Sequence, residues 1–180
     1  MSDSNQTGGV ARVVKEFYEK SEGQVDLYWE DVESAALKVI SQMKQENFVP
    51  DIIISIARSG LIPASLISYV LGNKELYTIK IDFSKTQRLS HKQDMREQPK
   101  ISQELSRDIE GLRVLVVDEM VVSGETLKLV SQYLAMKHPG EVKYAVLYKQ
   151  PWTQFQPHYC GEEVRAWPVF PWKRLMEEKN

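Results

Sequence analysis

Two adjacent carboxylates, Asp118 and Glu119, directly follow an apolar run that is rich in valine. Four residues after Glu119, a short turn of small and hydroxyl-bearing residues opens the next segment, with the sequence Ser123-Gly124-Glu125-Thr126. Glycine lets the backbone approach a ligand closely, and the unpaired amides at the start of a helix attract anions. Carboxylates accept hydrogen bonds from sugar hydroxyls and can hold Mg²⁺ directly or through water. The segment therefore predicts a site for a ligand that has both a phosphate and sugar hydroxyls.

Two other phosphate-binding motifs do not occur in this turn. It contains neither Gly-x-x-x-x-Gly-Lys nor Gly-x-Gly-x-x-Gly, so neither a P-loop nor a dinucleotide site is supported. A simpler interpretation is that the acids only end a strand and that Ser123 only caps a helix. That interpretation does not account for the two acids and the phosphate-binding turn together.

A second loop with phosphate-binding character follows an earlier apolar run. Its sequence is Ala57-Arg58-Ser59-Gly60, and a further apolar segment comes after it. The planar guanidinium of arginine can bond two phosphate oxygens at once. On its own this loop could equally be an ordinary turn.

Together the two loops resemble the type I phosphoribosyltransferases, which use 5-phosphoribosyl-1-pyrophosphate (PRPP). Asp118 to Leu127 is similar to the PRPP-binding signature of that family, and Ser55 to Ala64 is similar to its pyrophosphate loop. The resemblance implies that Arg58, Asp118 and Glu119 are the catalytic residues and that the two acids hold ribose hydroxyls and Mg²⁺. The PRPP-binding residues that it implies are Ala57, Arg58, Ser59, Gly60, Asp118, Glu119, Val122, Ser123, Gly124, Glu125 and Thr126.

Two C-terminal segments resemble the xanthine-guanine type and the archaeal purine phosphoribosyltransferases. One surrounds Lys149, and the other, rich in tryptophan and proline, includes Trp167 and Pro168. The resemblance implies that Lys149 donates to the purine O6, that Trp167 stacks on the base and that the backbone of Pro168 accepts at the 2-position. For Trp152 and Trp172 we expect ordinary hydrophobic packing.

The sequence departs from this pattern in the turn itself. Relatives that use 6-oxopurines usually have an aspartate near the purine N7 where this chain has Val122, and valine cannot move a proton. Glu119 also replaces the commoner second aspartate. Three hypotheses follow: transfer to hypoxanthine, guanine or xanthine; transfer to a different base; or a regulatory protein that binds PRPP or a nucleotide without turnover. The presence of Arg58 favours an enzyme.

The elements that must position these residues alternate along the chain. Helical spacing of apolar residues predicts helices over 10–22, Trp29–Glu46, Ile62–Leu71 and Glu125–Lys137. Apolar, β-branched runs predict strands over Asp51–Ala57, Leu76–Phe83, Leu112–Asp118 and Val142–Tyr148. We expect an α/β fold, an open and mostly parallel sheet with helices on both faces, and a small C-terminal cap. Ser84–Arg107 reads as a loop that could include a short strand, and the resemblance implies a flap there.

The bulk properties fit one globular enzyme. A chain of 180 residues with 42% hydrophobic and 27% charged residues can bury a core, and a net charge of −2 gives no broad surface for nucleic acid. Its single cysteine, Cys160, excludes an internal disulfide, and no apolar run is long enough to span a bilayer. We expect a cytoplasmic protein without nucleic-acid or membrane partners, with an extension over residues 1–26 and one domain over residues 27–180. Residues 150–180 would form the base-binding cap, and we expect a homodimer or a higher homo-oligomer.

Overall fold

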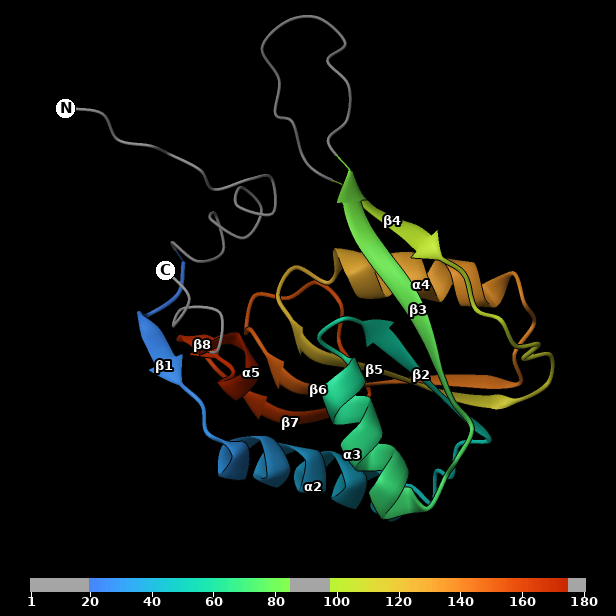
Figure 1. Ribbon diagram of the computed structural model, residues 1–180, viewed down its shortest axis with the longest axis horizontal. Helices are drawn as coiled ribbons and strands as arrows, with labels where there is room; N and C mark the ends of the chain where they lie inside the picture. The colour runs from blue at the N-terminus through green and yellow to red at the C-terminus, as the bar shows by residue number, and fades with distance from the viewer. Residues whose placement is uncertain (1–19, 85–97, 175–180) are drawn as a thin grey trace, which may run out of the picture.

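The computed structural model describes residues 20–84 and 98–174, in which helices and strands alternate (Figure 1). The helices are α2 (Trp29–Gln45), α3 (Leu61–Leu71), α4 (Glu125–Ala135) and the short α5 (Pro171–Arg174). The strands are β1 (Gln24–Asp26), β2 (Ile52–Ala57), β3 (Leu76–Ser84), β4 (Gln98–Gln103), β5 (Arg113–Val121), β6 (Glu141–Lys149), β7 (Tyr159–Glu163) and β8 (Trp167–Val169). Within the described ranges, no helix is both long and apolar enough to cross a membrane.

Six of the strands form one sheet in the order β4-β3-β2-β5-β6-β7. All neighbouring pairs are parallel except β3 and β4, which are antiparallel. The predicted open, mostly parallel sheet is therefore confirmed. The order places β2, β5 and β6 side by side at its centre, so the loops that follow these three strands leave from the same edge.

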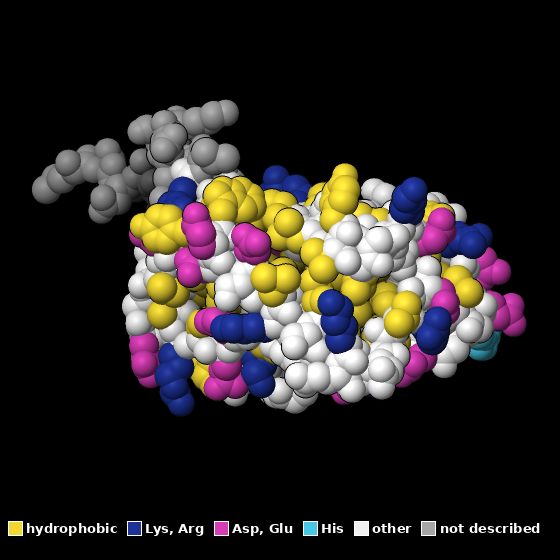
Figure 2. Space-filling view, turned by 90° about the horizontal axis from the view of Figure 1, so that it is seen from below, with side chains coloured by type: hydrophobic (Ala, Val, Ile, Leu, Met, Phe, Trp, Pro, Cys, Tyr) yellow, Lys and Arg dark blue, Asp and Glu magenta, His cyan; other side chains and the backbone are white. Residues whose placement is uncertain are grey.

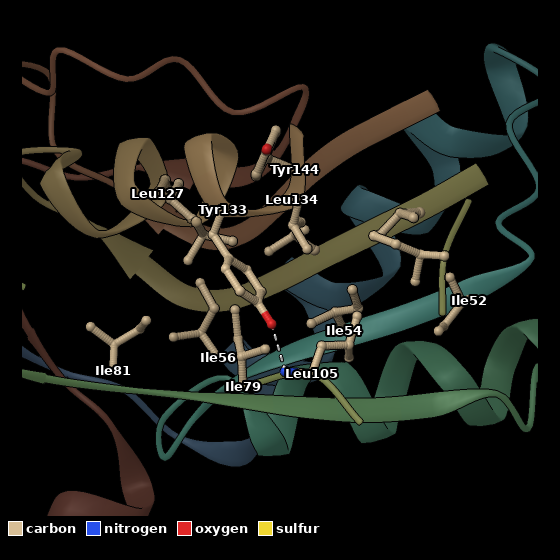
Figure 3. Close-up of a cluster of buried hydrophobic side chains, with 14 of the residues drawn as sticks. Ile52, Ile54, Ile56, Ile79, Ile81, Leu105, Leu127, Tyr133, Leu134 and Tyr144 are labelled. Carbon is tan, nitrogen blue, oxygen red and sulfur yellow. Dashed lines mark hydrogen bonds between the residues drawn. The ribbon is translucent and has the colours of Figure 1, made fainter. Parts of the chain in front are cut away.

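Helices cover both faces of this sheet, as predicted. Side chains of a strand alternate between its two faces, and in β2 Ile52, Ile54 and Ile56 pack with the buried side of α4. Ile53 packs instead with α2 and α3. Figure 3 shows the α4 side of the core, where the hydroxyl of Tyr133 accepts a hydrogen bond from the amide of Leu105 at 2.9 Å.

The C-terminal residues are organised differently from the compact appendage that the sequence predicts. β7 pairs in parallel with β6 and forms an edge of the main sheet. Outside that sheet, β8 pairs in parallel with β1, and α5 follows β8 (Figure 1). We call the unit of β1, β8 and α5 the hood. Its assembly from both ends of the chain was not predicted, because a three-residue strand leaves almost no periodic pattern in the sequence.

Most predicted elements agree with the structure within a few residues. The helix expected over residues 10–22 lies almost wholly outside the described residues, as do positions 85–97 of the expected loop. The strand expected over Leu112–Asp118 continues to Val121, and β4 is the short strand that the loop could include. The extension of β5 matters for the site, because it places both acids inside the strand.

Candidate active site

Three loops meet at the carboxyl edge of the central strands. Residues 58–60 follow β2, residues 122–124 follow β5, and residues 150–158 follow β6. These strands are parallel neighbours, with Ser55 opposite Val117 and Val121 opposite Lys149. Ligands of open α/β sheets bind beyond this edge. The topology therefore brings together the three loops that the sequence singles out.

The loop after β2 approaches β5 through a glycine that no other residue could replace without movement. A Cβ atom on Gly60 would lie 2.5 Å from the carbonyl oxygen of Val117 and 2.7 Å from that of Ile56. Both contacts are to backbone, which cannot move aside as a side chain can. The peptide bond between Ala57 and Arg58 is cis, and the side chain of Arg58 is exposed. Gly60 thus holds the arginine loop beside the strand that contains Asp118.

The turn after β5 is held by the loop after β6. Gly124 has a φ of +93°, and a Cβ there would lie 2.5 Å from the Cβ of Phe155. The amide of Gln154 donates to the carbonyl oxygen of Ser123 at 3.1 Å, and the amide of Glu125 donates to the Ser123 hydroxyl at 3.3 Å. Gly124 precedes α4, so the turn leads into the amino end of that helix. Anions bind at such ends because the first amides have no partner inside the helix.

The two acids point to opposite faces of the sheet. In β5, Val116 packs on the α4 side and Val117 on the side of α2 and α3. Alternation then directs Asp118 to the α4 side, where the turn lies, and Glu119 to the other side. Burial, together with the charge of Glu119, raises the pKa of Asp118 to about 8. The Asp118 Oδ1 accepts a hydrogen bond from the Glu119 amide at 2.8 Å.

Glu119 is buried, with 5% of its surface exposed, and both of its carboxylate oxygens are engaged by α5. Lys173 Nζ lies 2.5 Å from Oε1, and Trp172 Nε1 donates to Oε2 at 3.2 Å. Of the two acids that the sequence predicts as ribose and Mg²⁺ ligands, only Asp118 therefore has carboxylate oxygens free of the hood. Among the described residues, no three His, Cys, Asp or Glu side chains lie together as a metal site.

The residues predicted to bind a base lie on joined segments. Lys149, the last residue of β6, has its Nζ 3.2 Å from Glu163 and 3.3 Å from the side-chain oxygen of Gln156. Next to it, the buried Gln150 donates through its side chain to the carbonyl oxygen of Ala166 at 3.2 Å. Ala166 immediately precedes Trp167, which is half-buried, and Pro168, which is buried. Gln150 thus links the loop after β6 to β8.

Three contributors to this site were not predicted. Gln150 lies beside Lys149 in a segment that resembles the family but was given no role, and Phe155 lies beyond that segment. Lys173 follows Trp172, for which we expected only packing. The sequence did hold a hint that a partner such as Lys173 was needed. In a strand, the second of two adjacent acids points to the opposite face from the first. A carboxylate buried in that way needs a cation or hydrogen-bond donors nearby.

Comparison with known proteins identifies the family. The chain matches the phosphoribosyl transferase domain over residues 28–178. It belongs to the phosphoribosyltransferase family. The crystal structure of a purine phosphoribosyltransferase from Pyrococcus horikoshii is 32% identical, with a TM-score of 0.72, over 83% of this chain and 93% of that one. A xanthine-guanine phosphoribosyltransferase of Gluconobacter oxydans is 27% identical over 147 residues, which are 80% of this chain and 81% of the relative.

A further structural neighbour supports the phosphoribosyltransferase fold alone. The xanthine-guanine-hypoxanthine phosphoribosyltransferase of Helicobacter pylori is 23% identical, with a TM-score of 0.74, over 86% of this chain and 97% of that one. The family that the two loops resemble is therefore confirmed, and so is the fold class predicted from the alternating helices and strands. The family match begins at residue 28 and so leaves β1 outside it. The roles of the individual site residues stay predictions.

Proposed function

We propose that this phosphoribosyltransferase transfers the 5-phosphoribosyl group of PRPP to a purine base, giving a nucleoside 5′-monophosphate and pyrophosphate in purine salvage. The observation that supports this most is the meeting of three loops at one edge of the sheet. Gly60 packs the arginine loop against β5, and the Gln154–Ser123 hydrogen bond joins the phosphate turn to the loop after β6. Pyrophosphate, ribose phosphate and base would each have one loop.

The chain's contribution to the reaction would be positioning and charge stabilisation, because no covalent intermediate is required. Arg58 would bind the departing pyrophosphate, and the amides and hydroxyls of Ser123 and Thr126 would hold the 5′-phosphate. Lys149 has three N–H donors. It could therefore donate to the purine O6 while Glu163 and Gln156 accept from it.

Mg²⁺ would reach the site with PRPP and neutralise its pyrophosphate. Asp118 fits as its protein ligand, directly or through water, because hard oxygen donors suit this ion. Glu119 does not fit while Lys173 and Trp172 occupy its oxygens. The charge that Asp118 must carry for this role conflicts with its raised pKa, and the arriving cation would resolve the conflict by favouring the ionised form.

The decisive experiment incubates the protein with PRPP, Mg²⁺ and each common nucleobase and measures pyrophosphate release. We expect release with hypoxanthine, guanine or xanthine. Release only with another base would support the second hypothesis, which the apolar Val122 favours. PRPP binding without release for any base would refute an enzyme and support a regulatory protein.

Lys149→Ala tests how the base is recognised. If Lys149 donates to O6, kcat/KM should fall roughly ten- to hundred-fold for 6-oxopurines, the cost of one charge-assisted hydrogen bond, and much less for 6-aminopurines. An equal fall for both classes of base would contradict the assigned role. Glu163→Gln is a matched control, because it removes the ion-pair partner and keeps the donor.

We also propose that the protein forms a homodimer or a higher homo-oligomer in the cytoplasm. α3 is apolar nearly all round, which is typical of a buried helix, yet Leu61, Tyr69 and Val70 are exposed. Figure 2 views the face of α2 and α3, where apolar side chains lie among charged ones. Tyr69→Glu should lower the mass measured by light scattering on a sizing column, and an unchanged mass would argue against this interface.

A further inference from the structure

The contacts of Glu119 divide the acidic pair between two tasks. Glu119 lies two residues before the end of β5, the strand proposed to hold PRPP, but its partners come from the last described helix, α5. Its two oxygens bind Lys173 at 2.5 Å and Trp172 at 3.2 Å. The adjacent Asp118 points to the opposite face, where the phosphate turn lies. One acid is thus left for PRPP, and the other fixes the position of the hood.

Aromatic packing covers this ion pair. Trp172 stacks on the buried Phe170 with ring centroids 4.7 Å apart, and Lys173 Nζ lies 5.1 Å from the centre of the Phe170 ring. Trp29, the first residue of α2, contacts Trp172 with centroids 5.8 Å apart. Lys173 therefore lies between an aromatic face and a buried carboxylate, although 39% of its own side chain is exposed. The buried side of the pair is less screened than it would be in water.

The same segment holds the residues proposed to bind the base. β8, with Trp167 and Pro168, ends immediately before Phe170, the ring that packs on Trp172 and Lys173. On its other side, β8 pairs with β1. The amide of Trp167 donates to the carbonyl oxygen of Gly23, and the amide of Leu27 donates to the carbonyl oxygen of Val169. The bonds from Lys173 and Trp172 to Glu119 link the hood, through side chains, to β5, the strand that contains Asp118.

We infer that Glu119 is a positioning residue rather than a ligand of PRPP or Mg²⁺: with Lys173 and Trp172 it sets the distance between the base-stacking ring of Trp167 and the ribose at Asp118. This inference rests on the proposed function. Displacing one reactant by about an ångström can cost on the order of a hundred-fold in rate. Loss of the contact should therefore impair use of the base and leave capture of PRPP largely intact.

The test compares Lys173→Met, Glu119→Gln and the double variant with the unmodified chain in steady-state kinetics. We expect KM for the base to rise about ten-fold or more in each single variant, with KM for PRPP changed by less than about three-fold. The double variant should be less impaired than Lys173→Met, since it no longer buries an unpaired carboxylate. Lys173→Arg should restore most of the loss, because it retains the charge.

A matched control is Lys143→Met. Lys143 is also a partly buried cation with carboxylate partners, Glu46 and Glu141, but it lies near the amino end of β6, away from the site. Its variant should keep both KM values. If Glu119→Gln instead raises KM for PRPP or the Mg²⁺ requirement while Lys173→Met leaves KM for the base unchanged, Glu119 is a ligand and the inference is wrong.

A readout without turnover separates failure of this inference from failure of the proposed function. The indole N–H of Trp172 donates to Glu119, so its proton NMR resonance should move in Lys173→Met and in Glu119→Gln, and stay in Lys143→Met. If the unmodified chain releases no pyrophosphate with any base, the proposed function fails. The contact between Glu119 and the hood is then tested by this resonance and by the affinity for a purine nucleoside monophosphate. Both Lys173→Met and Glu119→Gln should weaken that affinity. An unmoved resonance refutes the contact itself.

Discussion

Replacing Asp118 by asparagine measures the electrostatic cost of burying an acid on the α4 side of β5. Burial and the neighbouring Glu119 raise the pKa of Asp118 to about 8, whereas an aspartate in the unfolded chain titrates near 4. Between these values the native state holds a proton that the unfolded state has released. The contribution of the Asp118 carboxyl to the free energy of unfolding is therefore fully present below pH 4 and is lost as the pH rises toward 8. Asparagine has no such proton and retains an oxygen for the Glu119 amide.

The magnitude follows from the size of the pKa shift. A shift from 3.8 to about 8 is roughly four pKa units, and at about 1.4 kcal/mol each this sets an upper limit of about 6 kcal/mol. Asp118 is only half-buried as a residue, so screening by nearby solvent lowers this limit. We expect Asp118→Asn to gain about 2 kcal/mol in free energy of unfolding between pH 5 and pH 8, relative to the unmodified chain.

The assay is urea unfolding of both proteins at several pH values, in metal-free buffer without PRPP. Other groups also titrate in this range. Burial lowers the pKa of His158, for example, so its contribution to stability rises with pH up to about 6.5. These contributions cancel in the difference between the two proteins. A difference in unfolding free energy that stays constant from pH 5 to pH 8 would refute a raised pKa at Asp118.

Two substitutions and one chemical modification give further tests of packing and burial. Gly60→Ala should cost about 1–3 kcal/mol and abolish PRPP binding, since its Cβ meets the backbone of Val117 at 2.5 Å; urea unfolding and calorimetry measure the two effects. Gly124→Ala combines a positive φ with a clash against Phe155 and should cost a similar amount, so an unchanged unfolding midpoint would contradict it. Burial raises the pKa of the Cys160 thiol to about 11, so iodoacetamide should modify it slowly at pH 8 in the native state and rapidly in urea, as mass spectrometry would show.

Much of the fold could be predicted because its elements are long and strongly patterned. The strand over Asp51–Ala57 is apolar at every position from Ile52 to Ile54, and the buried residues of α2 recur at helical spacing. The short elements could not be predicted in the same way. β1 and β8 have three residues each, and their pairing joins positions more than 140 residues apart, such as Gln24 with Trp167. No local pattern encodes such a contact.

For the site, the sequence predicted which loops meet, but not to which face of the sheet each acid points. The loops meet because β2, β5 and β6 are neighbours, which follows from the α/β pattern. Asp118 and Glu119 look equivalent in the sequence, as a pair of acids before a phosphate turn. The structure separates them, because β5 continues past both and a strand turns successive side chains to opposite faces.

The different positions of the two acids explain why this sequence identifies PRPP, the phosphoribosyl donor, more firmly than the base that accepts the group. The loops that we propose to bind PRPP follow central strands of the sheet, where backbone contacts at Gly60 and Ser123 fix their positions. Trp167 and Pro168, which we propose to bind the base, lie in the hood. The hood is bonded to the sheet through the side chains of Gln150, Trp172 and Lys173. Side-chain contacts can be exchanged without changing the sheet. A hood held in this way can shift relative to an unchanged ribose site, so differences in base preference should map to the hood and its contacts.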